Sequence, residues 1–507
     1  MSPDNWSDWW RKRRAGLTAF GGIAVFFSLF FARVFINHRF IITGDAFYYT
    51  YPLRTVAWNM IRSGSAPLWT PLLLSGYPLI SVPLLAVGYP VTWTHLFLPG
   101  HWAEQIYALA PFLLSPLTTY AYAREIGRSR LASVFAGLSF GYGGMMCGIL
   151  ANSGMLTNGF IWCPLLLLFI ERARKRSFAH CLLWATVAYS MSVLAGHGQS
   201  YVYSGVLGLA YGLFTSLHLA SVARDDQAWW RGGPHWRPLM VAVGAILLSG
   251  AVAAFQLFET VRVARLSVRS ALSYEVFSEG SFTLREAFLS LGAQLYHYID
   301  TGTYVTPLAL VLAVVALGFA IRHGVIDARI WFWAGVAVVA FLMLLGSNTP
   351  LNRLLHNVPV INMFRVPSRH TFEWTLAISI LAAFGWDATA SLLKNQRERA
   401  SRMEIGIVLG LLALTAAVGV FWWRAIVQWP EPHPTIYTAL PERSYWLWKL
   451  AFTALLFVLA WRSFRIATKR SRQIMLIAVI GLACFVEANA TVTCWWAGFV
   501  SLPAQRF

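Results

Sequence analysis

A single acid lies in the first polar stretch after the N-terminal apolar run. Asp45 stands in an aromatic-rich segment, residues 43–52, and the next acid along the chain is Glu104. A carboxylate beside a reacting hydroxyl can take its proton, which makes Asp45 a candidate general base. The same residue type also caps helices and occurs in loops, and that interpretation stays open.

Two arginines flank a proline further along the chain. Arg365 and Arg369 lie on either side of Pro367, just before a long apolar run. Guanidinium groups suit phosphate oxygens because they donate two parallel hydrogen bonds. Arg54 is a third candidate for the same phosphate. Arginines at a membrane surface also extend their charged ends toward water, and this alternative remains open.

Five further residues are candidates for binding a substrate: Glu259, His197, Gln199, Tyr48 and His370. Glu259 ends an apolar run, where it also fits a simple helix ion pair with Arg262. His197 and Gln199 belong to a Gly-His-Gly-Gln turn. A lone histidine in such a turn is more often structural than catalytic.

Motifs for metal, disulfide and nucleotide binding are weak. Four of the five cysteines, Cys147, Cys163, Cys181 and Cys484, lie in or near apolar runs, and no CxxC or His/Cys spacing is typical of zinc. Residues 141–144 are glycine-rich but lack a following lysine, so we expect close helix packing there instead of a phosphate loop. The net charge of +19 lies mostly in short loops, where it fits anionic lipid better than nucleic acid.

The elements that position these residues are predicted to be membrane-spanning helices. Of the 507 residues 57% are apolar and 12% charged, whereas soluble proteins carry about 25% charged residues. Apolar runs of about 20 residues form helices in lipid because every backbone polar group must be satisfied within the segment. The first run follows a basic cluster, as in a signal peptide, but it is too long and lacks a small-residue cleavage site.

The sequence predicts an all-α polytopic protein with about thirteen spans. They are 15–36, 105–122, 131–149, 155–170, 178–195, 200–219, 239–258, 304–321, 330–346, 371–391, 404–423, 445–462 and 473–490. Residues 79–99 are apolar but broken by three prolines, and we interpret them as interfacial or re-entrant, or as a further span. The domains are a basic N-terminus (1–14), a transmembrane domain (15–490) and a C-terminal tail (491–507).

The distribution of basic residues predicts the orientation. With the N-terminus in the cytoplasm, the inner loops contain 25 of the 40 Lys and Arg residues, as the positive-inside rule requires. The long outer segments are then about 37–104, 259–303 and 347–370, and the tail is external. This asymmetry predicts chemistry on the outer face, with Asp45, Arg365 and Arg369 on one side of the bilayer.

A short helix is expected on the membrane surface in the first outer segment. Pro52 can open it, and the apolar residues from Leu53 to Ile61 recur with i, i+3, i+4 spacing. Arg54 and Arg62 fall on its polar side in this prediction. Turns rich in glycine, proline and aromatic residues follow it.

The outer segments resemble those of YfhO-like bacterial membrane proteins. The resemblance rests on Gly44-Asp45, Tyr51-Pro52, 67–69, 75–79 and Tyr89-Pro90, and then on 195–199, 259–269, 348–351 and 364–369, in the same order. It covers nearly the whole chain. A glycine at 198 replaces the proline usual in that family's turn.

That family is similar to the GT-C glycosyltransferases, and the resemblance implies an activity. Such enzymes transfer sugar from a polyprenyl-phosphate donor to an envelope glycan, lipid or protein at the outer face of the bacterial cytoplasmic membrane. Asp45 matches their first-loop acid, which serves as base or as a ligand of Mg or Mn. Many of them have two neighbouring acids there, and this chain has one. Our hypothesis is inverting transfer, with Arg365 and Arg369, and Arg54 as a third candidate, on the leaving phosphate.

Two other classes of function fit the same composition. A transporter or flippase of a lipid-linked saccharide also needs arginines and a lipid groove, but it should carry charges near mid-membrane. A non-catalytic partner in envelope assembly should tolerate substitution at Asp45, Arg365 and Arg369.

Overall fold

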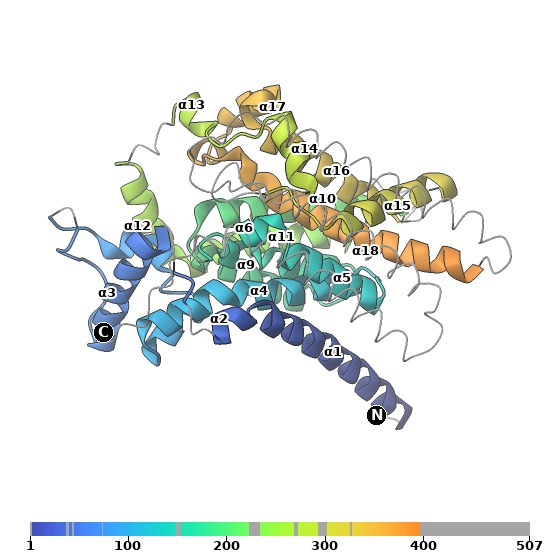
Figure 1. Ribbon diagram of the computed structural model, residues 1–507, viewed down its shortest axis with the longest axis horizontal. Helices are drawn as coiled ribbons and strands as arrows, with labels where there is room; N and C mark the ends of the chain where they lie inside the picture. The colour runs from blue at the N-terminus through green and yellow to red at the C-terminus, as the bar shows by residue number, and fades with distance from the viewer. Residues whose placement is uncertain are drawn as a thin grey trace.

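The described part of the chain is all-helical (Figure 1). The computed structural model describes residues 3–36, 40–42, 45–73, 75–148, 154–222, 234–267, 272–292, 302–324 and 327–395. These ranges contain no named strand, and a single antiparallel bridge pairs Thr70 with Tyr77. The predictions for spans 404–423, 445–462 and 473–490 and for the tail lie outside the described residues.

Helices occupy all ten predicted spans within the described ranges. They are α1 (Pro3–Phe30) with α2 (Ala32–Ile36), α4 (Gly100–Glu125), α5 (Arg130–Gly141) with α6 (Gly144–Gly148), α7 (Thr157–Phe160) with α8 (Cys163–Arg172), α9 (Phe178–Leu194), α10 (Gly198–Val222), α11 (Arg237–Val252), α15 (Pro307–His323), α16 (Ala328–Leu344) and α18 (Thr371–Asn395). Shorter helices lie between them: α3 (Tyr51–Arg62), α12 (Ala254–Ala264), α13 (Tyr274–Phe277), α14 (Leu284–Gly292) and α17 (Pro350–His356).

Several of these helices have the length and composition of membrane spans. Arg130–Gly148 and Gly198–Leu219 qualify as continuous spans, and α11 with α12 qualifies as a pair bent by 81°. Gly16–Phe30, α9, Leu308–His323 and α16 are apolar but shorter. The described chain therefore has the architecture of a polytopic helical membrane protein.

The structure excludes the further span that is one alternative for residues 79–99, and it shortens one predicted span. Residues 79–99 contain three 3-10 helices, Leu79–Ser81, Pro83–Leu85 and Pro90–Leu96, and no spanning helix, because the prolines interrupt the backbone ladder. The span predicted at 239–258 ends early, since the chain turns at Ala253. Gln256 and Thr260, just past the bend, donate hydrogen bonds to the carbonyls of Ile80 and Ser81.

Helix α18 is central to the bundle and packs against α5, α15 and α16. The close approach of α15 depends on Gly385, because a Cβ there would lie 1.8 Å from the carbonyl oxygen of Leu312. Aromatic rings fill the layer beside α18, where Phe372 stacks on Phe160 at 4.0 Å between ring centres.

One end of the bundle is joined by buried and half-buried ion pairs. Glu171 accepts from both Arg174 and Arg329 at 2.6 Å, and Arg128 lies within 4.0 Å of Asp327 and Asp387. These residues come from the segments predicted to form inner loops, so we call this the inner end. The N-terminus, the last turn of α18 and the start of α5 lie toward the same side of Figure 1.

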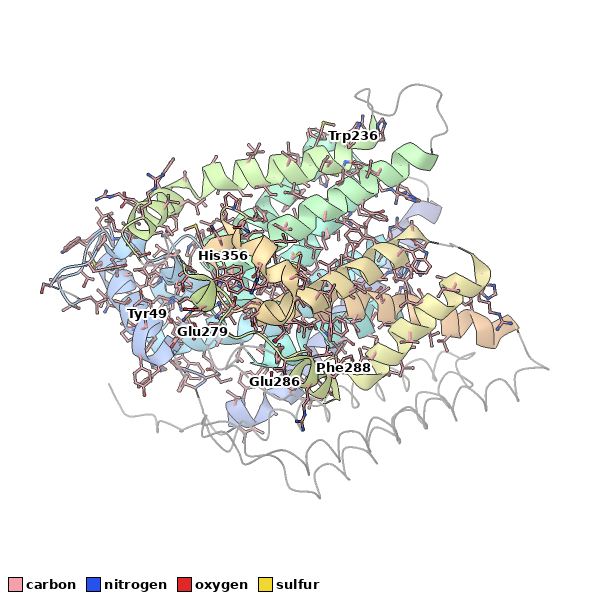
Figure 2. The ribbon with its side chains drawn as sticks, turned by 90° about the horizontal axis from the view of Figure 1, so that it is seen from above. Tyr49, Trp236, Glu279, Glu286, Phe288 and His356 are labelled. Carbon is pink, nitrogen blue, oxygen red and sulfur yellow. The ribbon has the colours of Figure 1, made fainter. Side chains whose placement is uncertain are left out.

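The segments predicted to face outward meet at the opposite end. Helices α3, α12, α13 and α17 lie toward the left of Figure 1, and Tyr49, Glu279 and His356 lie toward the left of Figure 2. Gln199 reaches the backbone of Arg365, and Arg365 pairs with Glu279. The contacts thus separate the loops into the two groups that the charge pattern predicts, and we call the second group the outer end.

Substituting Gly385 with alanine tests the α15–α18 contact. We expect Gly385→Ala to lower stability by about 1–3 kcal/mol, because the new methyl must displace backbone. Gly318→Ala is the matched control, since a Cβ at Gly318 in α15 meets nothing within 4 Å. Thermal unfolding of the purified protein in detergent measures both variants, and equal midpoints would contradict the packing.

Candidate active site

Asp45 lies exposed at the start of a short π-helix, Ala46–Thr50. Its side chain makes no capping hydrogen bond to this helix. Ala46 and Thr50 are buried beneath it, whereas Tyr48 is 81% exposed. The short helix therefore presents Asp45 and Tyr48 outward.

Helix α3 continues directly from this π-helix, at the place where a short amphipathic helix is predicted in the first outer segment. Leu53 and Ala57 are buried against Leu79, Val82 and Leu85. Pro52 occupies the first turn, where a missing backbone N–H costs nothing. The predicted apolar face is therefore the packed face.

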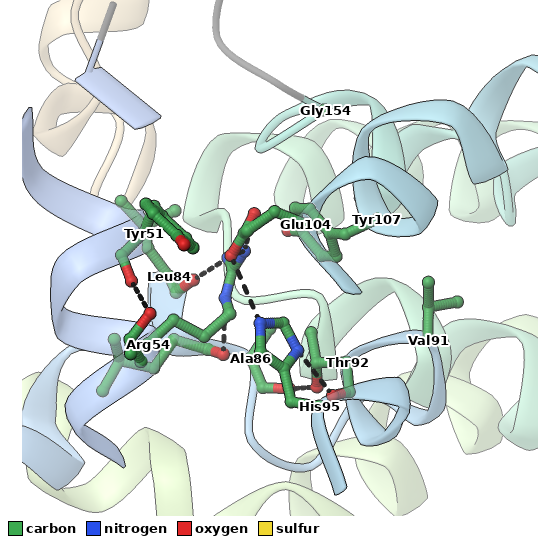
Figure 3. A network of polar contacts seen from close by, with 12 residues as sticks. Tyr51, Arg54, Leu84, Ala86, Val91, Thr92, His95, Glu104, Tyr107 and Gly154 are labelled. Atoms are coloured by element: carbon green, nitrogen blue, oxygen red, sulfur yellow. Dashed lines mark hydrogen bonds and ion pairs between the residues drawn. The ribbon is translucent and has the colours of Figure 1, made fainter. Parts of the chain in front are cut away.

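Arg54 is the exception to that prediction, because it is fully buried on α3 (Figure 3). Its Nη1 donates to Glu104 of α4 at 2.5 and 2.7 Å. Its Nη2 and Nε donate to the carbonyls of Leu84 and Leu85, and the guanidinium lies 4.1 Å from the ring centre of Tyr107. The expectation that Arg54 faces the polar side of α3 is wrong, because Glu104 neutralises the charge inside the protein.

This environment leaves Arg54 little access to a lipid phosphate. Its guanidinium is 0% exposed and already binds one carboxylate and two carbonyls. Arg54 instead joins α3, the 79–99 segment and α4. These contacts fix the position of α3 and, through it, of the π-helix at whose start Asp45 lies.

His95 completes this buried cluster. Its Nε2 lies 3.7 Å from a Glu104 oxygen, its Nδ1 contacts the Thr92 carbonyl at 2.9 Å, and its ring stacks on Trp58. Burial, together with the nearby positive charge of Arg54, lowers the pKa of His95 from 6.5 to about 4. His95 is therefore neutral at physiological pH.

Gln199 and Arg369 form a second polar cluster where α10 and α18 begin. Arg369 donates to the Gln199 side-chain oxygen at 2.8 Å, and Gln199 donates to the Tyr203 hydroxyl at 2.7 Å. Gln199 also contacts the carbonyls of Arg365 and Val366. Because Gln199 is buried, it fixes both the guanidinium and the backbone before α18.

The backbone between the two arginines is strained. Val366 has φ +69°, a left-handed conformation that is rare for a β-branched residue. Such a residue costs about 1–3 kcal/mol, and strain of this kind is concentrated at functional sites. Gln199 supplies part of the compensation, since it accepts and donates hydrogen bonds across this turn.

Arg365 points away from this buried cluster. It is half exposed and pairs with Glu279 at 2.9 Å. The outer turn therefore carries two guanidinium groups. Arg369 contacts the buried Gln199, and Arg365 pairs with the half-exposed carboxylate of Glu279.

His370 and Glu373 extend the second cluster into α18. The His370 ring stacks on Tyr203 at 4.2 Å, and its Nδ1 lies 3.3 Å from a Glu373 oxygen. Glu373, in the first turn of α18, thus pairs with His370. Its second oxygen is buried without a hydrogen-bond partner among the described residues.

The Gly-His-Gly-Gln turn joins this cluster to the first outer segment. Gly196 has φ +87°, and a Cβ there would lie 1.8 Å from the Pro83 carbonyl oxygen. His197 lies 3.3 Å from Ser200 within the same turn. The turn thus touches residues 79–99 on one side and, through Gln199, the arginine turn on the other.

Glu259 lies apart from both clusters. It pairs with Arg262 on α12 at 3.4 Å, which is the helix ion pair left open by the sequence. The structure therefore gathers Gln199, Arg365, Arg369 and His370, and places Arg54 and Glu259 elsewhere. The hydrogen bonds that join these four residues to their neighbours do not involve Asp45.

Sequence reasoning missed several partners in these clusters: His95, Glu104, Tyr203 and Glu279. Glu104 had a usable signal, since it is an isolated acid at the start of an apolar run. Glu279 had no such signal, because its partner Arg365 is 86 positions away. Tyr203 had none either, because its role depends on the stacked ring of His370.

The donor set does not form a metal site on its own. Within the described ranges, no three or more His, Cys, Asp or Glu side chains gather as metal ligands. Divalent cations such as Mg²⁺ are usually held by one or two carboxylates together with water and substrate phosphate. Asp45 offers a single carboxylate, so a bound ion would need its other ligands from water and the substrate phosphate.

Comparisons with known proteins find similarity only in the path of the backbone. No family model and no curated protein matches this chain. The crystal structure of ArnT from Cupriavidus metallidurans in the apo state is similar with a TM-score of 0.48 and 13% identity, covering 95% of this chain and 77% of that chain. ArnT bound to undecaprenyl phosphate gives 0.47 and 14%, covering 93% and 76%. At these values the likeness carries no argument about function.

Removing the charge of Glu104 tests the buried pair. We expect Glu104→Gln to lower stability by about 3–5 kcal/mol, because it leaves the Arg54 charge buried and uncompensated. Glu259→Gln is the control, since its exposed pair contributes at most about 1 kcal/mol. Thermal unfolding in detergent compares the two, and a Glu104→Gln loss no larger than the control would contradict the anchor.

His95 makes stability depend on pH. Its folded pKa of about 4 lies below its ordinary 6.5, so the unfolded chain binds a proton first as the pH falls. Stability present above pH 6.5 should therefore be lost progressively between 6.5 and 4. We expect the thermal unfolding midpoint of His95→Gln to vary less with pH across this window than that of the parent. Parallel curves of midpoint against pH for variant and parent would refute the assignment.

Proposed function

We propose that this chain is a GT-C-type membrane glycosyltransferase, which moves a sugar from a polyprenyl-phosphate donor to an envelope glycan, lipid or protein at the outer face. The observation that carries the proposal is the strained turn before α18, in which buried Gln199 contacts both the Arg369 side chain and the Arg365 backbone. Strain retained around two guanidinium groups fits a site built for an anion.

Arg365 and Arg369 would bind the donor phosphate. Arg369 is already oriented by Gln199, so it loses little freedom when it binds. Arg365 would exchange its exposed Glu279 partner for the phosphate. An exposed ion pair contributes at most about 1 kcal/mol, so this exchange is inexpensive.

Asp45 would act on the acceptor. Its carboxylate takes the proton of the acceptor hydroxyl, whose oxygen attacks C1 of the sugar from the face opposite the phosphate. The C1–O bond to phosphate breaks, and its electron pair stays on the phosphate oxygen. The arginines then neutralise the charge that develops on the leaving polyprenyl phosphate.

Asp45 and the arginine turn belong to parts of the outer end that are joined through the 79–99 segment. Arg54 and Glu104 fix the helix below Asp45, and the Gly196 turn packs on Pro83 of the same segment. Donor and acceptor must bridge these two parts for transfer to occur. The proposal thus requires Asp45 and Arg369 to act in one reaction.

The distribution of charged residues favours a glycosyltransferase over a transporter. In α4, α15, α16 and the start of α18 the charged residues lie near the helix ends: Glu104 and Arg124 in α4, Arg322 in α15, Arg329 in α16, and Glu373 in α18. Helix α9 has none, and Asp387 of α18 contacts the inner-end Ser129. A transporter is expected to carry charges near mid-membrane.

Binding of undecaprenyl phosphate to the protein in nanodiscs tests the phosphate site. We expect Arg369→Gln to raise the Kd about 10- to 100-fold, because a hydrogen bond to a charged group contributes about 1.5–3 kcal/mol. Arg353→Gln on α17 is the control, as an exposed arginine of the same outer end. Equal affinities for the parent and both variants would contradict the assignment.

The rate of transfer in the same nanodiscs tests the base. With polyprenyl-phosphate-linked sugars extracted from membranes as donors, mass spectrometry follows the release of free polyprenyl phosphate. Asp45→Asn should reduce that release about 10²–10⁴-fold without changing binding, whereas Glu275→Gln, at another exposed outer acid, should not. Passage of the intact donor across the bilayer without release would indicate a transporter. Equal release by the parent and Asp45→Asn would contradict the assignment of the base, and no release by the parent would indicate a non-catalytic partner.

A further inference from the structure

We infer that α12 is a membrane-surface helix, whose exposed face inserts between lipid phosphates at the outer end. The helix follows the apolar α11 after a bend of 81°. If α11 crosses the bilayer close to its normal, α12 must run nearly parallel to the membrane plane. This inference does not depend on the proposed reaction.

The exposed face of α12 is unusually apolar. Phe258 is 76% exposed, and Phe255 and Val261 are each about half exposed. Their i, i+3, i+6 spacing places all three on one side of the helix. Removing large apolar side chains from water is favourable, so water is a poor environment for this face.

The apolar face continues without a break from α11. Val243, Leu247 and Val252 are exposed on α11 and lead through the bend to Phe255. On a span candidate, such residues face lipid. The face of α12 that carries Phe255 and Phe258 therefore lies in the same lipid environment as the exposed face of α11.

Basic residues lie among these apolar residues. Arg262 and, just after the helix, Arg265 are exposed on the same side, and Arg262 pairs with Glu259 at 3.4 Å. Phenylalanine and arginine on one face are typical of helices that lie at the boundary between acyl chains and headgroups. The arginines can reach lipid phosphates while their apolar stems stay among the acyl chains.

The opposite face of α12 binds the first outer segment. Gln256 is buried and donates to the Ile80 carbonyl at 2.7 Å, and Thr260 donates to the Ser81 carbonyl. Residues 79–82 in turn pack against Leu53 and Ala57 of α3. A lipid-inserted α12 would therefore hold this segment, and the helix that follows Asp45, at the level of the phosphate groups.

Site-directed spin labelling in nanodiscs tests the inference. Cys484 and Cys494 are replaced by alanine, and the buried Cys147, Cys163 and Cys181 are left in place. A nitroxide at Phe258→Cys should collide readily with oxygen and little with a water-soluble nickel chelate. A nitroxide at Glu275→Cys, an exposed position on α13, should show the reverse.

Two results would overturn the inference. A label at 258 as accessible to the nickel chelate as the label at 275 would place the face in water. A label shielded from both reagents would mean that protein covers it, either residues 396–507 or a second copy. Val261→Cys repeats the measurement on the same face, should the Phe258 variant not fold.

Discussion

The buried ion pair between Arg54 and Glu104 is the interaction on which the outer end depends. A lone guanidinium inside a protein is strongly unfavourable, so Arg54 can be buried only while Glu104 lies opposite it. The carbonyls of Leu84 and Leu85 take its remaining donors. One side chain therefore ties α3, the 79–99 segment and α4 together, and any movement of one of them uncovers an unpaired charge.

The rest of the outer end is built upon this anchored segment. The Gly196 turn packs on Pro83, α12 donates hydrogen bonds to Ile80 and Ser81, and α3 buries its apolar face against Leu79 and Val82. Residues 79–99 can serve this purpose because their prolines leave backbone carbonyls free of helical partners. The same prolines that interrupt a span thus provide acceptors for two other elements, α3 and α12.

The two ends of the bundle use charge in different ways. At the inner end, Glu171, Arg174 and Arg329 satisfy one another, which leaves the network structural. At the outer end, Arg369 contacts the buried Gln199 amide, and Arg365 pairs with the half-exposed carboxylate of Glu279. The inner-end pairs are shielded from solvent, whereas Arg365 presents a half-exposed guanidinium to it.

The sequence by itself determined the class of fold, because lipid allows few solutions to an apolar chain. Runs of apolar residues at 105–122, 178–195 and 371–391 had to become helices, and the basic loops between them had to group at one end. It also determined the apolar face of α3 from the spacing of Leu53 and Ala57, since helical periodicity is a local property.

Only the tertiary structure decided what the polar residues do. Arg54 has the same sequence signal as Arg369, an arginine near a proline beside an apolar run, yet one is buried on Glu104 and the other lies at the surface turn with Gln199. The bend after α11 likewise needed partners, since Gln256 has no helix-breaking character and its contact, Ile80, is 176 positions away. Local spacing fixes which face a side chain occupies, but its electrostatic partner depends on how distant elements pack.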